Sequence, residues 1–251
     1  MRGNVFMATE SKTASSLAET GERACWSCGA SRAAQFCNTC GKVQPPQSVD
    51  YFTFFGLPRK LNIDLSRLQR EFYELSRKLH PDLYGQTSKQ EQEWSLEQSS
   101  LLNDAYRTLK DPIKRTGYLL RLEGVELEEQ SKSATETARV SGEIKKQVVP
   151  PDLLEEVFEL NMQLEELRMN RKMGEDDPAL TGELEVHKAE FEKKFEVLTQ
   201  ELKQYWDQWD RVVDLDGDDS RHQVRDKMVD VLNRRNYIRN LVRDVNEALG
   251  S

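Results

Sequence analysis

Leu79-His80-Pro81-Asp82-Leu83 separates two long segments whose apolar residues recur at helical spacing. In the first segment, which follows the candidate N-cap Asp64, these residues are Leu65, Leu68, Phe72, Leu75 and Leu79. Because a proline disfavours helical geometry in the residue before it, the first helix must end at His80. In the second segment the apolar positions are Trp94, Leu101, Leu102, Ala105, Tyr106 and Leu109. The sequence therefore predicts two antiparallel helices joined by His-Pro-Asp.

Shorter helical patterns flank this hairpin. A short aromatic helix after Asp50 is stopped by Gly56 and Pro58. On the other side, Asp111-Pro112 is a helix start and Gly124 a helix stop, with Tyr118, Leu119 and Leu120 between them. We therefore expect a compact helical domain over residues 48–124.

The composition limits the classes of protein that fit. The chain has 251 residues with 37% hydrophobic content, which favours several small helical units over one deep core. A net charge of -8 argues against a nucleic-acid partner. We find neither a long apolar run nor a secretory signal, and expect a soluble intracellular chain without a membrane partner. Residues 1–24 predict a disordered tail whose acidic residues favour the bacterial cytoplasm over the mitochondrial matrix.

All four cysteines form two Cys-x-x-Cys pairs separated by eight residues: Cys25 and Cys28, then Cys37 and Cys40. The glycine after each pair permits a positive φ angle, which lets amide hydrogens approach the sulfurs. Four thiolates satisfy tetrahedral zinc and leave no open position for catalysis, so residues 25–44 predict a structural zinc module. A redox-active Cys-x-x-Cys uses a single pair in a βαβ context, which does not fit here. Iron or a pair of disulfides stays the alternative.

Residues 48–124 resemble a J domain. The resemblance rests on Asp50-Tyr51-Phe52, the basic helix, His80-Pro81-Asp82 and the block from Leu102 to Pro112, which occur in that order. In that family the tripeptide and the basic face of the preceding helix bind a DnaK-type chaperone and stimulate its ATPase. The resemblance implies chaperone contacts at His80, Pro81, Asp82, Arg70, Arg77 and Lys78. From the residues alone, the tripeptide is also compatible with a simple helix-ending turn, and the basic residues with a solvated face.

Beyond a polar linker at residues 125–151, residues 152–249 carry three long helical patterns. The first, for which Asp152 is the candidate cap, has two apolar stripes roughly 140° apart. One stripe comprises Leu153, Val157, Leu160, Leu164 and Leu167, and the other comprises Leu154, Phe158 and Met162. Only one stripe can face the core of a three-helix bundle. We expect the second to be an exposed partner surface, unless a loop or the J domain covers it.

A zinc module, a J domain and an acidic three-helix bundle, in this order, are similar to the HscB family of co-chaperones in iron-sulfur cluster assembly. There the bundle binds the cluster scaffold IscU and delivers it to an HscA-like DnaK-type chaperone. The resemblance implies scaffold contacts at Leu154, Phe158, Glu159, Met162, Glu166 and Tyr237. The linker and the turn near Gly174 are longer than the family usually has, and Glu155 replaces an apolar residue of some members. The zinc module occurs in only part of the family, which leaves its task, and a homodimer, open.

We therefore expect an all-α protein: a J domain with an antiparallel helical hairpin, a C-terminal three-helix bundle and a small N-terminal zinc knuckle. The first functional hypothesis is a co-chaperone for the cluster scaffold. The alternatives are a J protein with another client and a metal- or nucleic-acid-binding protein with a helical tail. We do not expect an enzyme, since His80, His187 and His222 fit no recognised pattern of nucleophile, base and orienting group.

Overall fold

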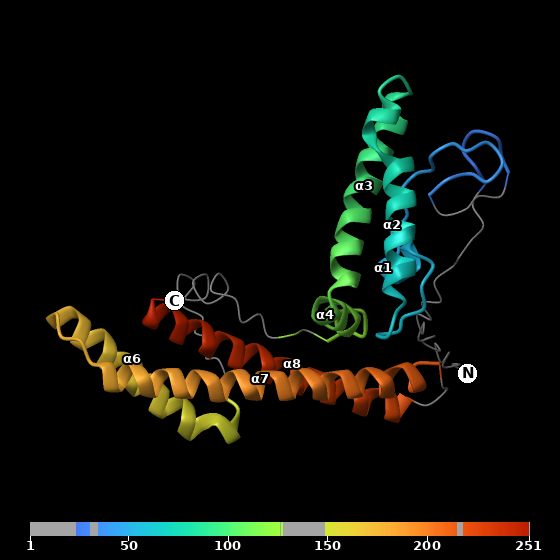
Figure 1. Ribbon diagram of the computed structural model, residues 1–251. Coiled ribbons are helices and arrows are strands. Elements are labelled where there is room, and N and C mark those ends of the chain that lie inside the picture. Colours follow the sequence, from blue (N-terminus) through green and yellow to red (C-terminus); the bar gives the residue numbers. More distant parts are fainter. Residues whose placement is uncertain (1–23, 31–34, 126, 128–148, 215–217, 251) are drawn as a thin grey trace, which may run out of the picture. The chain divides into compact units, whose positions relative to one another are not determined.

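The computed structural model describes residues 24–30, 35–125, 127, 149–214 and 218–250 (Figure 1). The all-α prediction is confirmed for these residues: they form no β-ladder, and the antiparallel bridge of Phe36 with Val43 is isolated. The tail predicted before residue 24 and nearly all of the predicted linker lie outside the described residues. The helices are α1 (Tyr51–Phe54), α2 (Leu65–Leu79), η1 (Pro81–Tyr84), α3 (Lys89–Lys110), α4 (Pro112–Leu122), η2 (Pro151–Leu153), α6 (Leu154–Met173), α7 (Pro178–Val212) and α8 (Asp218–Leu249).

The chain divides into two compact units. The first unit combines the residues up to Ser48 with Leu79–Ser99, so it holds the four cysteines, the His-Pro-Asp turn and the first half of α3. The second unit combines Val49–Lys78 with the chain from Ser100 onward, and it holds most of the remaining J-domain helices and the three long C-terminal helices.

Aspartate caps fix the helix starts that the sequence predicts. The Asp50 carboxylate accepts the backbone N–H groups of Phe52 and Thr53 at 3.0 and 3.1 Å. Asp111 Oδ1 accepts the N–H groups of the first turn of α4, both at 2.9 Å. Asp64 Oδ1 accepts the N–H of Arg67 at 3.0 Å. Each carboxylate satisfies amide groups that have no partner within the helix, so the boundaries are set locally.

Helix α2 packs against the second half of α3 within the second unit. The rings of Phe72 and Tyr106 stack with centroids 4.0 Å apart, and Leu68 of α2 and Leu102 of α3 are buried. Leu65, which the pattern placed on the buried stripe, is exposed. It is the first residue of α2, so the stripe begins one turn later than the sequence predicts.

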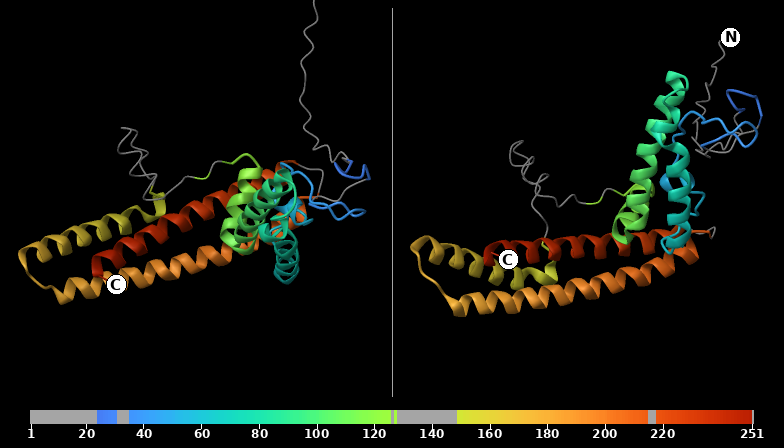
Figure 2. Two further views of the ribbon diagram at one scale, coloured as in Figure 1. Left: turned by 90° about the horizontal axis from the view of Figure 1, so that it is seen from above. Right: turned by 45° about the horizontal axis from the view of Figure 1, so that its top comes forward.

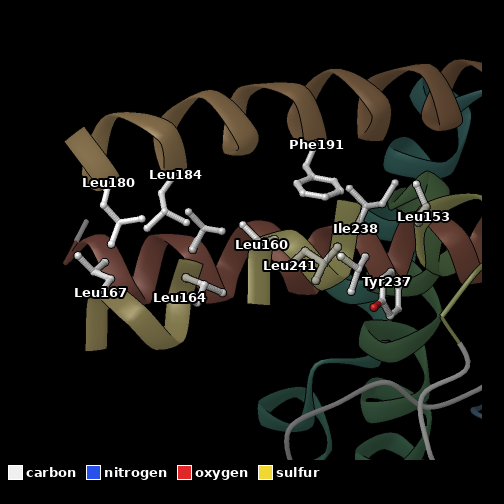
Figure 3. Packing of buried hydrophobic residues seen from close by; sticks show 12 residues of the cluster. Leu153, Leu160, Leu164, Leu167, Leu180, Leu184, Phe191, Tyr237, Ile238 and Leu241 are labelled. Carbon is white, nitrogen blue, oxygen red and sulfur yellow. The ribbon is translucent and has the colours of Figure 1, made fainter. Parts of the chain in front are cut away.

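Helices α6, α7 and α8 lie side by side and form the predicted three-helix bundle (Figure 2). Gly174, at φ 75°, ends α6, and Asp177 caps α7. Figure 3 shows the core between these helices, where leucines of α6 and α7 meet apolar side chains of α8. Twelve buried residues form this core: Leu153, Val157, Leu160, Leu164, Leu167, Leu180, Leu184, Phe191, Tyr237, Ile238, Leu241 and Val245.

One predicted cap is wrong. Asp152 does not cap α6, because the chain already turns from Pro151 as the 3₁₀ helix η2, and Asp152 lies inside that turn. Leu153 takes the N-cap position without a side-chain hydrogen bond. The Asp152 carboxylate instead pairs with the Arg234 guanidinium of α8, so it ties the start of α6 to another helix of the bundle.

Helix α7 also holds the loop that joins α1 to α2. The Asp210 carboxylate accepts the backbone N–H groups of Leu61 at 2.7 Å and of Asn62 at 2.9 Å. The carbonyl of Leu61 in turn accepts Nε of the buried Arg115 at 2.9 Å. Burial lowers the pKa of this guanidinium from its ordinary value, yet hydrogen bonds to carbonyls satisfy it. A charged network therefore fixes this loop within the second unit.

Candidate functional site

The His-Pro-Asp turn is a single turn of 3₁₀ helix with its own hydrogen bonds. His80 occupies the N-cap position of η1, and its Nδ1 accepts the backbone N–H of Asp82 at 3.3 Å. The carbonyl of His80 accepts the N–H of Leu83 at 3.0 Å. Pro81 restricts the backbone and cannot donate a hydrogen bond. The turn is therefore stiff, and the imidazole of His80 and the carboxylate of Asp82 are exposed to solvent.

The base of this turn is anchored by two serines of α3. Leu79 is the last residue of α2, and its carbonyl is one of those that a helix end leaves without an intrahelical N–H. It accepts Oγ of Ser95 at 2.8 Å and Oγ of Ser99 at 2.7 Å. Helix α3 thus holds the peptide group that leads into His80.

The basic residues of α2 lead in sequence to the turn. Arg70, Arg77 and Lys78 are all exposed. Arg70 and Arg77 line one shallow hollow of about 320 Å³ together with Tyr73, Glu74 and Ser76. Such a face offers guanidinium groups that can pair with carboxylates of a partner. The structure brings Arg70 and Arg77 to the same hollow, and Lys78 lies outside its lining.

The four cysteines meet in space, as their spacing predicts. Their sulfurs lie within 4.8 Å of one another. Cys25 Sγ is 3.7 Å from Cys40 Sγ, and Cys28 Sγ is 3.6 Å from Cys37 Sγ. Sulfurs that share a tetrahedral zinc at about 2.3 Å would be about 3.8 Å apart. All four are free cysteines, so the donor set and its dimensions fit a four-thiolate metal site.

The electrostatics of the same cluster suit a cation. Burial alone would raise the pKa of Cys25, but backbone N–H groups of Cys28 and Ser27 and the amide of Gln44 donate to its sulfur and lower the pKa to about 6. The Ala30 amide favours ionisation of Cys28, yet burial and the neighbouring sulfurs of Cys37, Cys40 and Cys25 raise its pKa to about 12. Four sulfurs held this close resist full ionisation, and a bound cation removes that resistance.

The second stripe of α6 is exposed, as the sequence predicts. The exposed fractions of Leu154, Phe158 and Met162 are 54%, 67% and 60%. The opposite stripe is buried, because Val157, Leu160 and Leu164 face the bundle core. Glu159 and Glu166 are exposed on the same helix. The helix therefore presents an apolar surface bordered by carboxylates, a composition typical of a protein-binding face.

A groove along this helix contains two residues that the sequence analysis missed. It has a volume of about 530 Å³ and is lined by Phe158, Asn161, Met162, Glu165, Glu166, Met169, Asn170 and Met173. Met169 and Met173 follow Met162 by seven and eleven residues, which places them on the same side of an α-helix. That spacing is the signal that would have found them. We call Leu154, Phe158, Met162, Met169 and Met173 the α6 stripe.

Tyr237 does not join this surface. Its side chain is 5% exposed and lies in the bundle core, among Leu153, Ile238 and Leu241 (Figure 3). The apolar face of α8 packs inward in the bundle, so an aromatic residue on that face is buried. Its ring supports the bundle from within, and the scaffold contact that the family resemblance implies for Tyr237 stays a prediction.

Comparisons with known proteins agree with these features. Residues 50–118 match the DnaJ domain family. The iron-sulfur cluster co-chaperone protein HscB homolog of Arabidopsis thaliana is 38% identical over 143 residues, 57% of this chain and 51% of that protein. Mus musculus iron-sulfur cluster co-chaperone protein HscB is 30% identical over 190 residues, 70% of this chain and 75% of that protein. The match thus spans about half the length of the plant relative and three quarters of the mouse relative.

A solved structure shares the fold. The crystal structure of human co-chaperone protein HscB matches with a TM-score of 0.55 at 24% identity, covering 89% of this chain and 97% of that one. Among the described helices, none combines the length and hydropathy that a bilayer crossing needs. With a DnaJ domain in its N-terminal half and a relative that aligns over most of both chains, this protein belongs to the HscB family of iron-sulfur cluster co-chaperones.

Proposed function

We propose that this protein binds the iron-sulfur cluster scaffold IscU through α6 of its bundle and delivers the scaffold to an HscA-like DnaK-type chaperone. In this proposal the His-Pro-Asp turn stimulates the ATPase of that chaperone. The nucleotide chemistry belongs to the chaperone, and this chain contributes binding surfaces. Family membership supports the general role, and the two exposed surfaces support the assignment of each partner.

The chaperone contact is assigned to His80, Pro81 and Asp82, with Arg70, Arg77 and Lys78 of the helix that precedes them in the sequence. The exposed Asp82 carboxylate can accept a charge-assisted hydrogen bond from a partner arginine. Nδ1 of His80 accepts the backbone N–H of Asp82, so the Nε2 side of the ring can contact a partner. The guanidinium groups in the α2 hollow add long-range attraction to an acidic surface.

The observation that carries the scaffold assignment is the exposed apolar stripe on a helix whose other side already fills the core. Monomeric proteins rarely leave such a continuous apolar strip to water. The contact residues in this proposal are Leu154, Phe158, Met162, Glu159 and Glu166. The carboxylates favour a partner surface that carries basic side chains beside its apolar residues.

We also propose that the metal of the four-cysteine module is structural zinc. Cys25, Cys28, Cys37 and Cys40 would hold it, and the ion would supply four covalent-like cross-links to a short segment. Iron, the alternative for the same four thiolates, is distinguished by metal analysis of the purified protein. We expect one zinc per chain. A result of one iron per chain would show that the metal of the module is iron.

Titration of the full chain against apo-IscU tests the proposal, with the HscA-like ATPase rate measured with and without IscU. We expect saturable binding of apo-IscU. We also expect this protein to stimulate the ATPase more strongly when IscU is present than when it is absent. Stimulation without any IscU binding would favour the alternative, a J protein that delivers another client. The sequence favours the bacterial cytoplasm over the mitochondrial matrix, and cell fractionation tests this compartment. Analytical ultracentrifugation tests whether the protein forms a homodimer.

A further inference from the structure

Three polar side chains on the first half of α3 are almost fully buried. The exposed fractions of Glu91, Ser95 and Gln98 are 4%, 0% and 1%. Buried polar groups cost free energy unless they are hydrogen-bonded, so each needs a specific partner. Glu91 and Gln98 find theirs in the four-cysteine module, and Ser95 finds its partner at the base of the His-Pro-Asp turn. This half-helix therefore serves two neighbours within the first unit.

The four-cysteine module contacts one face of α3 at three points. Lys42 Nζ pairs with Glu91 Oε1 at 2.8 Å. The rings of Trp26 and Trp94 meet edge to face with centroids 5.6 Å apart. Gln98 Nε2 donates to the backbone carbonyl of Gln44 at 2.6 Å. Residues three, four and seven apart share one side of a helix, so the module lies along a single face.

Gln44 joins a metal ligand to this helix. Its side chain is fully buried, and its Nε2 donates to Cys25 Sγ at 3.3 Å and to the carbonyl of Lys42 at 2.9 Å. Its own carbonyl is the group that Gln98 binds. Hydrogen bonds from outer residues to metal ligands orient those ligands, and the constraint acts in both directions. Gln44 thus connects the metal ligand Cys25 to α3, so a change at the metal can alter the position of this helix.

The adjacent face of α3 holds the turn. Ser95 and Ser99 each follow a module-contacting residue, Trp94 and Gln98, by one position. Their hydroxyls bind the carbonyl of Leu79, the residue before His80. The first half of α3 is therefore bound on one face by the module and on the next by the peptide group that starts the His-Pro-Asp turn.

We propose that the four-cysteine module is a metal-dependent brace for the His-Pro-Asp turn, and that Gln44 and Gln98 are the positioning residues that connect them. A segment this short cannot bury a core of its own, so the metal supplies most of its folding free energy. Loss of the metal releases Gln44 and Trp26, takes the Lys42 ion pair from Glu91 and the Gln44 carbonyl from Gln98, and loosens the helix that fixes Leu79. The consequence for ATPase stimulation rests on the proposed function.

Hydrogen exchange of the Leu83 amide reads the turn directly, because this N–H donates to the carbonyl of His80 at 3.0 Å. The full chain is loaded with Co²⁺, whose thiolate absorption reports occupancy, and is compared with the same protein stripped by EDTA. We expect stripping to speed exchange at Leu83 about fivefold or more, the effect of about one lost buried hydrogen bond. Equal exchange in both forms would show that the module is not a brace.

Gln98→Met separates the connection from the metal itself. Methionine keeps the length of the side chain but cannot donate to the Gln44 carbonyl. We expect the cobalt spectrum to persist while Leu83 exchanges faster in the loaded protein. Gln90→Met, at an exposed position of the same helix, is the matched control and should leave exchange unchanged. If Gln98→Met keeps both the spectrum and the wild-type exchange rate, the connection through Gln98 is refuted.

The ATPase assay adds the functional readout. A brace shapes the turn before the chaperone binds, so stripping or Gln98→Met should raise the half-maximal concentration about fivefold and leave the maximal rate near wild type. Unchanged half-maximal concentrations in both proteins would contradict the brace. If the loaded wild type gives no stimulation at all, the proposed function fails, and Leu83 exchange still decides the brace separately.

Discussion

The His-Pro-Asp turn consists of three consecutive residues whose hydrogen bonds are local, whereas the α6 stripe spreads apolar side chains along a helix. In the turn, the His80 ring and the Leu83 amide are tied to neighbours two and three residues away. The stripe exists as a surface only because three helices bury the opposite side of α6. A short sequence motif is therefore enough to identify the His-Pro-Asp turn. The α6 stripe can be identified only when it is known which side of α6 the bundle buries.

This difference predicts how each region responds to substitution. A local turn can lose its function by one change without loss of the fold. An extended apolar stripe loses binding free energy in steps, with a few central residues dominating. The predictions below use this contrast, from the largest expected effect to the smallest.

His80→Gln should abolish stimulation of the HscA-like ATPase and leave binding of IscU unchanged. The substitution removes the ring whose Nδ1 caps the turn and whose other side faces solvent. A steady-state ATPase assay with and without IscU measures the effect. Gln86→Ala, an exposed change just after the turn, is the control and should stimulate like wild type. Stimulation retained by His80→Gln would remove the turn from the mechanism.

Leu154→Ala combined with Phe158→Ala should weaken IscU binding about 100-fold, the effect expected when two exposed anchors of an interface are truncated. ATPase stimulation without IscU should be unaffected. Isothermal titration measures the affinity. The matched control is Val186→Ala with Val197→Ala on α7, because these valines are similarly exposed, at 60% and 59%, and lie outside the stripe. Equal losses in both double variants would show general destabilisation.

Met169→Ala with Met173→Ala tests whether the contact surface extends along the groove. These side chains line its far end and lie beyond the residues that the family resemblance implies. We expect IscU affinity to fall about fivefold, since peripheral apolar contacts contribute less than central anchors. Lys172→Ala, an exposed change on the same turn, is the control for the same titration. Wild-type affinity in the double methionine variant would end the surface at Met162.

Asp50→Asn should lower the free energy of unfolding of the J domain by about 1 kcal/mol and leave the α6 stripe intact. Burial alone would raise the pKa of Asp50, but hydrogen bonds from Arg59 and from the Thr53 amide hold it below its ordinary value of about 3.9. The ionised form therefore stabilises the fold above that value, and this stabilisation is lost as the pH falls through the lowered pKa. Melting temperatures of wild type and variant should differ near neutral pH and converge in acid; a constant difference would exclude this ionisation.

Much of the fold could be predicted because its signals are local. Asp111 and Pro112 predict the start of α4, and Gly174 predicts the end of α6, because each residue determines the backbone conformation at its own position. The spacing of the four cysteines predicted their convergence, because two knuckle turns present all the sulfurs on one side. The two stripes of α6 were visible as helical periodicity, and the structure confirms that the one containing Val157 is buried.

The failures involve choices made by distant residues. Asp152 has the composition of a cap, but Pro151 starts a 3₁₀ turn before it and Arg234 offers its carboxylate another partner. The burial of Tyr237 is likewise decided by the packing of α8 against the other helices of the bundle. Gln44 and Gln98 carry no local signal at all. They are polar residues 54 positions apart, and only the folded unit shows that one binds the other.

The thioethers of Met162, Met169 and Met173 give the α6 stripe a chemical property that the turn lacks. Exposed methionines are oxidised to sulfoxides, which are polar and hydrogen-bond to water. An oxidised sample would lose the apolar character of its scaffold surface while His80, Pro81 and Asp82 stay unchanged. Under the proposed function, the oxidised protein would still stimulate the chaperone ATPase but would bind the scaffold more weakly, and methionine sulfoxide reductase would reverse the change.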